Sequence, residues 1–589
     1  MNRPDRREAA AAAALVLVGV GLRLVVVALF PTEPLSDFRG LVLFGVRLRD
    51  EGLAVPGWQW VQFSPGLPLI LSGLFRLFPH GVVAVARNAT AVATGLLPLA
   101  PFLLWRRVLG LRARFFAGAL LALWPGQVLF AGVPAQENWA TLPAVALACL
   151  AARRLRFRDG RSWPVAAGLL FALAAVIRQE LLVVALPPAL AAAGLPGPNA
   201  GRRRRLLTLG LAAFLPLLAL AAERRAATGR FAILTEHGGL SLLGTVVPGS
   251  AAAGWTDPML YAASVDPGYL RDSARLRRDA GRLALREWGR RWRFHAYRAA
   301  VSALTLSVGS DRENLYWSLE APGALPPDRA APGLSLALRV APWLRAELAI
   351  VTGAFVAALV LAGRRRDPAI LVIASAVLLK ILVQVLFSPL GRLMVPAIAL
   401  ELLAIALGAA ALAAGSTRRE RTALAALAVG VAAALFFAVP PLRALAIRKD
   451  EAPPVLHRFP LGVAGAGGAF ADCTVEAGRI RGIGGDRVWV DPLAGKARVA
   501  CRLPALAPDA ALGLDLEAPD PLGVRVEADG RDRKATDPGS APGWRRAALT
   551  PEGAPAPSAV VLDADGPFGF GFVRRSGGAP PLPRDRVLP

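Results

Sequence analysis

The sequence predicts a polytopic α-helical membrane protein that ends in a C-terminal extracytoplasmic β-sandwich domain. Of its 589 residues, 55% are hydrophobic and only 19% are charged, values that exclude a soluble globule and a disordered chain. Apolar runs long enough to cross a bilayer recur along residues 1–440, whereas 457–589 are rich in Gly, Pro and Asp and contain short alternating runs typical of strands. We therefore expect a membrane domain over 1–440, a linker over 441–456 and a β-sandwich over 457–589.

Eleven apolar runs are bounded by charged residues, Pro or Gly, and each predicts a membrane-spanning helix. A hydrocarbon core about 30 Å thick requires about 20 residues of helix. The first run is too long for a signal peptide and has no small-residue cleavage site, so we expect it to remain as an anchor. The predicted spans are 9–30, 82–104, 115–133, 138–152, 163–177, 180–196, 206–222, 346–363, 368–387, 393–414 and 423–440.

Arginine is concentrated in every second connection between these runs. Basic residues beside a span resist translocation, so the arginine-rich connections and the N-terminus are expected in the cytoplasm. The loops 31–81 and 223–345 and the C-terminal domain then lie on the exterior, where Cys473 and Cys501 can form a disulfide. The net charge of +26 therefore reflects topology, and no nucleic acid is expected as a partner.

The two exterior loops contain segments that are expected to be helical without crossing the membrane. Residues 64–78 are apolar but short, and counting them as a span would invert every later loop. We therefore place them, with the amphipathic stretch 37–49, at the membrane surface or in a re-entrant helix. In the second loop, residues 269–307 have helical periodicity with Arg on one face.

Ionisable residues that can carry chemistry gather at the exterior ends of the predicted spans. Asp37 follows the first span, Glu137 lies between the third and fourth, Arg178 lies between the fifth and sixth, and Arg392 opens the tenth. A carboxylate such as Asp37 can take the proton from an attacking hydroxyl, and Arg can bind phosphate through two parallel hydrogen bonds. The arrangement suits a reaction on a lipid-linked sugar phosphate, because the lipid stays in hydrocarbon while its head group reaches the interface.

Two further candidates are Lys380 and His237. Lys380 lies about eight residues, or roughly 12 Å, below the exterior end of its span, where an unpaired ammonium is costly. It should face the bundle interior, toward a donor phosphate or toward a structural partner such as Gln384. His237 follows Glu236 in a Gly-rich exterior loop without the ligand spacing of a metal site, and the alternative is a loop histidine without a function. The sequence requires no cofactor and leaves a divalent metal open.

Three of the span-end candidates also have a structural interpretation. Asp37 can cap the helix that follows it, although Ser36 can do so alone. Glu137 can complement the dipole at the start of the fourth span, and Arg178 can be an interfacial residue paired with Glu180. For Asp37 and Glu137, the structural and the functional interpretations are compatible.

A set of short motifs carries a family resemblance over roughly residues 9–440. Its pieces are, in chain order, Asp37, then residues 64–78, 86–88, 122–125, 134–137 and 177–180, the Gly-rich stretch 234–244, and residues 391–396. Their order and sidedness resemble the GT-C superfamily of integral-membrane glycosyltransferases. The similarity is greatest to glycosyltransferase family 39, the protein mannosyltransferases, and to the aminoarabinose transferase that modifies lipid A. Many members carry a second acid directly after the first, whereas this chain has Phe38.

The resemblance implies a polyprenyl-phosphate sugar donor, an inverting transfer to an acceptor hydroxyl, and Asp37 as the base. The remaining candidates would bind substrate, with Glu137 and His237 near the acceptor or sugar and Arg178, Lys380 and Arg392 at the phosphate. It also implies the bacterial inner membrane as the location, with the C-terminal domain in the periplasm. The partners would be the lipid bilayer, the donor and an acceptor that is a protein, a lipid or a glycan.

Three other functions fit parts of the pattern. A flippase or transporter of lipid-linked saccharides would need polar groups near the bilayer midplane, whereas the polar groups here cluster on one face. A polymerase or ligase that uses polyprenyl-diphosphate glycans shares the topology and the donor chemistry but not the early exterior acid. A non-catalytic envelope protein would not need so many spans as an anchor. The sequence therefore favours sugar transfer.

Overall fold

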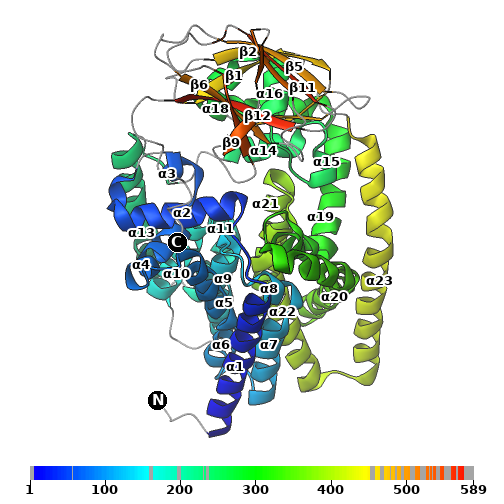
Figure 1. Ribbon diagram of the computed structural model, residues 1–589. Coiled ribbons are helices and arrows are strands. Elements are labelled where there is room, and N and C mark those ends of the chain that lie inside the picture. The colour runs from blue at the N-terminus through cyan, green and yellow to red at the C-terminus, as the bar shows by residue number, and fades with distance from the viewer. Residues whose placement is uncertain are drawn as a thin grey trace. The chain divides into compact units, whose positions relative to one another are not determined.

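The protein folds into two compact units (Figure 1). The helical unit comprises Met1–His237 and Ala296–Arg448, and the mixed unit comprises Gly238–His295 and Lys449–Pro589. The computed structural model describes residues 6–55, 58–157, 163–195, 201–229, 231–233, 238–451, 458–464, 470–477, 479–484, 487–491, 497–503, 511–517, 525–529, 531–533, 535–538, 544–549, 557, 559–564 and 568–575.

The helical unit is built from long apolar helices and short surface helices. In chain order these are α1 (Arg6–Leu29), α2 (Ser36–Asp50), η1 (Gly52–Ala54), α3 (Trp58–Gln62), α4 (Gly66–Leu77), α5 (Val82–Gly95), α6 (Leu99–Leu104), α7 (Leu111–Leu123), α8 (Pro125–Phe130), α9 (Gln136–Phe157), α10 (Pro164–Ile177), α11 (Leu181–Val184), α12 (Leu186–Ala192), α13 (Arg202–Thr228), α19 (Trp292–Leu315), η2 (Tyr316–Glu320), α20 (Pro327–Arg365), α21 (Pro368–Phe387), η3 (Gly391–Met394), α22 (Val395–Gly415) and α23 (Arg418–Lys449). The first turn of α19 and the last residue of α23 belong to the mixed unit.

Seven helices of the described chain are long and apolar enough to cross a membrane, so the prediction of a multi-pass membrane protein is confirmed. They are α1, α5 with α6, α13, α20, α21, η3 with α22, and α23. Each corresponds to one predicted span. The predicted spans 115–133, 138–152, 163–177 and 180–196 form α7 with α8, α9, α10, and α11 with α12.

These four segments are shorter, interrupted or more polar, so the count of eleven crossings stays a prediction. A proline disfavours helical backbone at the residue before it. Helix α7 accordingly ends at Leu123, before Trp124 and Pro125. Pro187 lies at the start of α12 and separates it from α11. Helix α9 ends in a basic turn, which lowers its mean apolarity.

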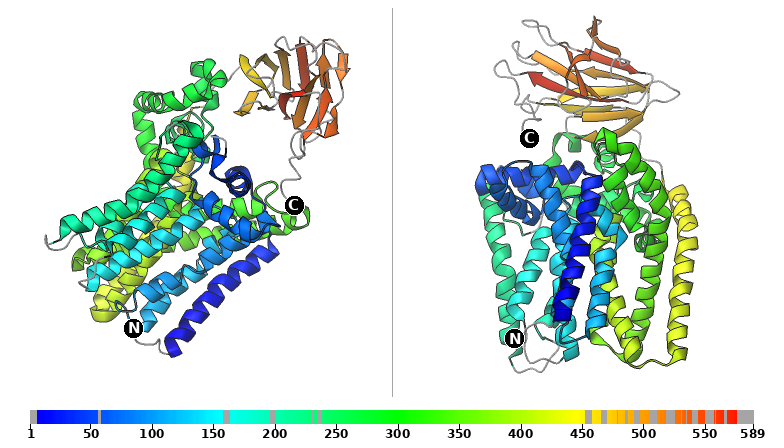
Figure 2. Two further views of the ribbon diagram at one scale, coloured as in Figure 1. Left: turned by 90° about the vertical axis from the view of Figure 1, so that its left-hand side faces the viewer. Right: turned by 60° about the horizontal axis from the view of Figure 1, so that its bottom comes forward.

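The long helices of the helical unit run roughly along a common direction (Figure 2). Helix α22 lies in the core, with nearly all residues from Val395 to Gly408 buried. Small residues allow helix backbones to approach closely in such bundles. A Cβ on Gly19 of α1 would lie 2.6 Å from the carbonyl oxygen of Gly95 in α5, so these two helices touch through their backbones.

The segments expected at the membrane surface form short helices that do not reach span length. Helix α2 has 15 residues and lies across the ends of the long helices (Figure 1). It buries one face, including Phe38, Leu41 and Phe44, and packs against α4. Helix α4 has 12 residues.

The mixed unit combines part of the second exterior loop with the C-terminal tail, a grouping that the sequence did not predict. Its helices are α14 (Gly238–Val246), α15 (Ser250–Ala253), α16 (Met259–Val265), α17 (Gly268–Arg271) and α18 (Ser273–Arg290). The apolar face of α18, with Leu276 and Leu283, packs on Leu243 and Val246 of α14. Outside this face α18 exposes arginines.

The tail forms a sheet of twelve described strands. These are β1 (Arg458–Ala464), β2 (Phe470–Ala477), β3 (Arg479–Gly484), β4 (Arg487–Asp491), β5 (Ala497–Arg502), β6 (Ala511–Glu517), β7 (Arg525–Ala528), β8 (Arg531–Arg533), β9 (Ala535–Pro538), β10 (Trp544–Ala548), β11 (Ala559–Ala564) and β12 (Phe568–Arg575). The hydrogen-bonded order is β8-β7-β11-β5-β2-β1-β12-β6-β10-β9, and β4 pairs with β12 and β3. All pairs are antiparallel except β1 with β12, and both halves contribute residues to one core.

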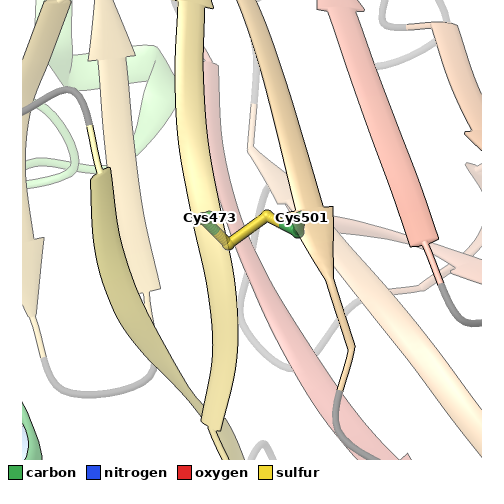
Figure 3. The surroundings of a disulfide bond; sticks show 2 residues. All are labelled: Cys473 and Cys501. Atoms are coloured by element: carbon green, nitrogen blue, oxygen red, sulfur yellow. A yellow bond between two sulfur atoms is a disulfide. The ribbon is translucent and has the colours of Figure 1, made fainter.

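A disulfide joins Cys473 of β2 to Cys501 of β5, where the two residues face each other across the ladder (Figure 3). Cys149 is free and buried in the helical unit. A structural disulfide is typical of an oxidising compartment, which indicates that the mixed unit lies outside the cytoplasm.

Residues 441–449 of the expected linker 441–456 are helical. Helix α23 continues through Pro440 and Pro441 to Lys449, beyond the predicted span 423–440. Prolines are tolerated inside membrane helices because neighbouring groups satisfy the freed backbone. The remaining linker residues 452–456 lie outside the described part of the chain.

Candidate active site

Asp37 and Arg392 form an ion pair within the helical unit. Nη2 of Arg392 donates a hydrogen bond to Oδ2 of Asp37 at 3.3 Å. Asp37 is in the first turn of α2, and 54% of its side chain is exposed. The preceding residue, Ser36, has a φ of +49°, in the left-handed region that non-glycine residues seldom adopt. The chain thus makes a sharp turn that aims the start of α2, and with it a solvent-accessible carboxylate, at Arg392.

Arg392 lies on the short helix η3, and its side chain packs against two aromatic rings. Its guanidinium lies 4.9 Å from the ring centre of Phe38 and 5.1 Å from that of Trp317. Only 9% of the residue is exposed, yet Nε and Nη1 have no hydrogen-bond partner. Cations stack favourably on aromatic faces, and a buried guanidinium with free N–H groups is suited to receive an anionic oxygen.

Glu313 is the second carboxylate at Arg392. Its Oε1 lies 3.6 Å from Nε of the guanidinium, and its Oε2 accepts a hydrogen bond from the backbone N–H of Arg392 at 3.3 Å. Glu313 also accepts a hydrogen bond from Nε1 of Trp317 at 3.4 Å. These contacts tie η3 to the end of α19 and to η2.

A second charged cluster joins α9 and α21 to the loop between α10 and α11. Nη1 of Arg178 donates to Oε1 of Glu137 at 2.7 Å, and Nε of Arg178 donates to Oε1 of Glu180 at 2.7 Å. Nζ of Lys380 donates to the same oxygen of Glu180 at 2.9 Å. With its amide oxygen facing Lys380, Gln384 accepts from Nζ at 2.7 Å and donates to the carbonyl of Ser388 at 2.8 Å.

The charges of this cluster reinforce one another. The carboxylate of Glu180 accepts hydrogen bonds from both Arg178 and Lys380. Burial opposes the charge of Arg178, but the carboxylates of Glu180 and Glu137 outweigh it and raise the pKa of Arg178 above its usual value. Asp37 contributes to the same rise, so its carboxylate is close enough to act on Arg178.

Local sequence features fix the hairpins that carry these groups. Asn138 donates to the carbonyls of Phe130 and Val133, both at 3.1 Å, which closes the turn before α9. A Cβ on Gly66 would lie 2.7 Å from the backbone nitrogen of Ile177, so α4 begins directly against the end of α10. The arrangement places the loop after α10, which bears Arg178, beside the surface helices.

A buried acid, Asp311, lies on α19, the same helix as Glu313. Asp311 is fully buried and accepts hydrogen bonds from Nε1 of Trp124 at 2.9 Å and from Nδ2 of Asn314 at 3.0 Å. A Cβ on Gly126 would lie 1.9 Å from Cγ of Asp311. The break between α7 and α8, with Gly126 at its start, therefore makes room for this carboxyl group.

The structure brings five of the six sequence-predicted residues into two neighbouring clusters. Asp37 and Arg392 form one cluster, and Glu137, Arg178 and Lys380 belong to the other. Lys380 faces the bundle interior with only 1% of its side chain exposed, and Glu180 and Gln384 are its partners. His237 lies outside the described residues.

Glu313 and Trp317 were not predicted, and Glu180 was expected only as an alternative partner of Arg178. The signal for Glu313 is the polar run 311–314 within a long helical segment, which the sequence alone assigns to an exterior loop. Among the described residues, no group of three or more His, Cys, Asp or Glu side chains is arranged to hold a metal ion. The chemistry available here is that of a carboxylate base beside a guanidinium.

No protein-family model matches the sequence, and no curated protein matches it. Among solved structures, the apo oligosaccharyltransferase of Archaeoglobus fulgidus matches with 16% identity over 76% of this chain and 56% of that chain, at a TM-score of 0.38. The oligosaccharyltransferase AglB of the same organism, in complex with an inhibitory peptide and a dolichol-phosphate, matches with 15% identity over 77% of this chain and 57% of that chain, at a TM-score of 0.35. The chain spans just over half the length of these enzymes. The likeness is remote and does not decide the activity.

Proposed function

We propose that the protein transfers a sugar from a polyprenyl-phosphate-linked donor to an acceptor hydroxyl at the outer face of the membrane, with inversion at the anomeric carbon. Asp37 is the base in this proposal, and Arg392 is the principal contact of the phosphate. The proposal concerns the helical unit alone.

The observation that carries the proposal is the pairing of an exposed carboxylate with a buried, incompletely bonded guanidinium. Asp37 is accessible to an acceptor from solvent, whereas Arg392 is 9% exposed and keeps Nη1 unpartnered. Inverting transfer needs a base on the acceptor side of the sugar and a cation on the side of the leaving phosphate. Asp37 and Arg392 lie 3.3 Å apart in this structure, so their ion pair has to open when the sugar occupies the space between the base and the leaving phosphate.

The reaction balances with these two groups. The acceptor oxygen attacks the anomeric carbon as its proton passes to a carboxylate oxygen of Asp37. The bond from the anomeric carbon to the phosphate oxygen breaks, and its electron pair stays with the polyprenyl phosphate. Arg392 stabilises the charge that grows on this oxygen, because its N–H groups are already oriented and need no reorganisation.

The second cluster supports the site in this proposal. Arg178 and Lys380 are each within 2.9 Å of a carboxylate, so two positive charges are balanced by the two of Glu137 and Glu180. We assign contact with the sugar or its phosphate to Arg178, 19% of whose side chain is exposed. Lys380 is too buried to reach a substrate and holds Glu180 against Arg178 instead. His237 stays a proposed acceptor contact.

The proposed location is the bacterial inner membrane, with the mixed unit in the periplasm. The disulfide of the mixed unit and the asymmetry of arginine between connections favour this orientation. The acceptor is a hydroxyl of a protein, lipid or glycan in that compartment.

The test uses full-length protein in lipid nanodiscs with a panel of polyprenyl-phosphate sugars, and it follows the release of free polyprenyl phosphate. The Asp37→Asn variant should lose at least about a hundredfold in rate, since general base catalysis contributes 10²–10⁴. Asp50→Asn is the matched control, because Asp50 ends the same helix, is 53% exposed at its side chain and pairs only with surface arginine. Equal rates for wild type and Asp37→Asn would remove Asp37 as the base. An absence of release with every donor, together with movement of labelled lipid across vesicles, would favour a flippase.

A further inference from the structure

Arg392 is shared between two carboxylates and closely bonded to neither. Its distances to Asp37 and Glu313 are 3.3 and 3.6 Å. Charge-assisted hydrogen bonds between guanidinium and carboxylate usually measure 2.7–2.9 Å. Arg178 in the same unit reaches that range with both of its carboxylates, at 2.7 Å each. Both distances at Arg392 are thus longer than those of the neighbouring cluster around Arg178.

Neighbouring groups also restrict the position of the Arg392 guanidinium. Phe38 and Trp317 both contact it, and the two rings meet edge to face with centres 5.5 Å apart. A Cβ on Gly391 would lie 2.7 Å from Cα of Ser310, so the backbone of η3 rests directly on α19. These contacts limit the movement of the Arg392 side chain.

Glu313 contacts the side chain and the backbone of Arg392 and also one of the two rings beside it. It lies at the guanidinium, accepts from the backbone N–H of Arg392 and accepts from the indole of Trp317. Asp37, in contrast, contacts only the end of the guanidinium at Nη2. Without an anion on the Glu313 side, the guanidinium would be attracted to Asp37 alone.

We propose that Glu313 is a positioning residue for Arg392. It draws the guanidinium away from a close ion pair with Asp37 and leaves Nη1 free for one oxygen of an anionic phosphate. The inference rests on the proposed function for the identity of that phosphate, a polyprenyl monoester, but its geometry stands on the contacts of Arg392 alone.

Two consequences separate positioning from a simple effect of charge. A carboxylate that acted only through its charge would repel phosphate, so its neutralisation would strengthen phosphate binding. A positioning carboxylate gives the opposite result, because its loss lets Arg392 close on Asp37 and withdraw from the phosphate.

The test measures the equilibrium binding of farnesyl phosphate to the full-length protein in nanodiscs. Glu313→Gln keeps an acceptor for the backbone N–H of Arg392 and should bind farnesyl phosphate about tenfold more weakly than wild type, the usual effect of one charge-assisted hydrogen bond. The matched control is Glu320→Gln, since Glu320 is a nearby glutamate that pairs with Arg312 and does not contact Arg392. In an Arg392→Gln background, Glu313→Gln should have no further effect, whereas a general structural loss would add to it.

Equal or tighter binding of farnesyl phosphate by Glu313→Gln overturns the inference, and so does an absence of binding by wild type. If Glu313→Gln does not fold, Glu313→Asp is measured against the same criterion, because its carboxylate retreats by one methylene. Turnover separates the two proposals. Loss of activity in Asp37→Asn with unchanged binding in Glu313→Gln would leave the proposed function standing and remove the role of Glu313. Weaker binding in Glu313→Gln without turnover of any donor would support the role of Glu313 and remove the proposed function.

Discussion

Lys380 donates a hydrogen bond to Glu180 at 2.9 Å, although the two residues are 200 positions apart in the chain. The same oxygen of Glu180 receives a hydrogen bond from Arg178 at 2.7 Å. One carboxylate oxygen thus serves two cations within the bundle, and α21 is tied to the loop between α10 and α11. Breaking such an arrangement on one side leaves an uncompensated charge, which costs more than the intact pair contributes.

Glu180→Gln should destabilise the helical unit by about 3 kcal/mol, because Lys380 and Arg178 then lack their shared anion. The double variant Glu180→Gln/Lys380→Met should recover much of that loss, since it removes the unpaired ammonium. Unfolding of the protein in detergent, followed by differential scanning fluorimetry, measures both. Additive losses in the double variant would contradict a coupled pair.

Arg392 should be sensitive even to a conservative change. Lys keeps the charge but lacks the planar group that lies against Phe38 and Trp317 and the second N–H that faces phosphate. Both Arg392→Lys and Arg392→Gln should lower kcat for the proposed transfer by roughly 10²–10³-fold, the effect of removing one preorganised donor. Arg39→Lys is a suitable control, because Arg39 is a half-buried arginine in α2, two residues after Asp37. Full activity of Arg392→Lys would limit the role of Arg392 to its charge.

Gly126→Ala should strongly destabilise the helical unit. The added Cβ would lie 1.9 Å from Cγ of the buried Asp311, and the carboxyl group can move away only by giving up its hydrogen bonds to Trp124 and Asn314. Overpacking of this kind costs about 1–3 kcal/mol or more. The control is Gly210→Ala in α13, which meets no atom within 4 Å and should leave the protein as stable or slightly more so. Comparable unfolding temperatures for the two variants would contradict the contact.

Removal of the disulfide should destabilise the mixed unit and leave the helical unit unchanged. The bond closes a loop with a sequence separation of 28, for which about 2–4 kcal/mol is typical. Replacing both Cys473 and Cys501 with alanine should raise the rate of proteolysis within the strands, as mass spectrometry of the fragments can show. Unchanged proteolysis would mean that the core of the sheet suffices without the bond.

Several parts of the fold were predictable because their signals are local. The length of an apolar run determines whether a helix can cross a bilayer, and seven runs behave as expected. Alternation of side chains predicted half of the twelve described strands of the tail, and the compartment predicted from arginine placement accords with a bond between Cys473 and Cys501. The effect of a proline was not predictable from the sequence, because it depends on the groups that surround the freed backbone. Helix α7 ends before Trp124 and Pro125, whereas α23 continues through Pro440 and Pro441.

By itself, the sequence determined that this is a multi-pass membrane protein and which charged residues lie near the ends of its helices. Only the tertiary structure decided which of them meet. Arg392 pairs with Asp37 across 355 positions and with Glu313 across 79, and no periodicity encodes such distances. The physical reason is that a buried charge without an opposite charge is costly, while the packing of the helices determines which opposite charge lies within contact distance.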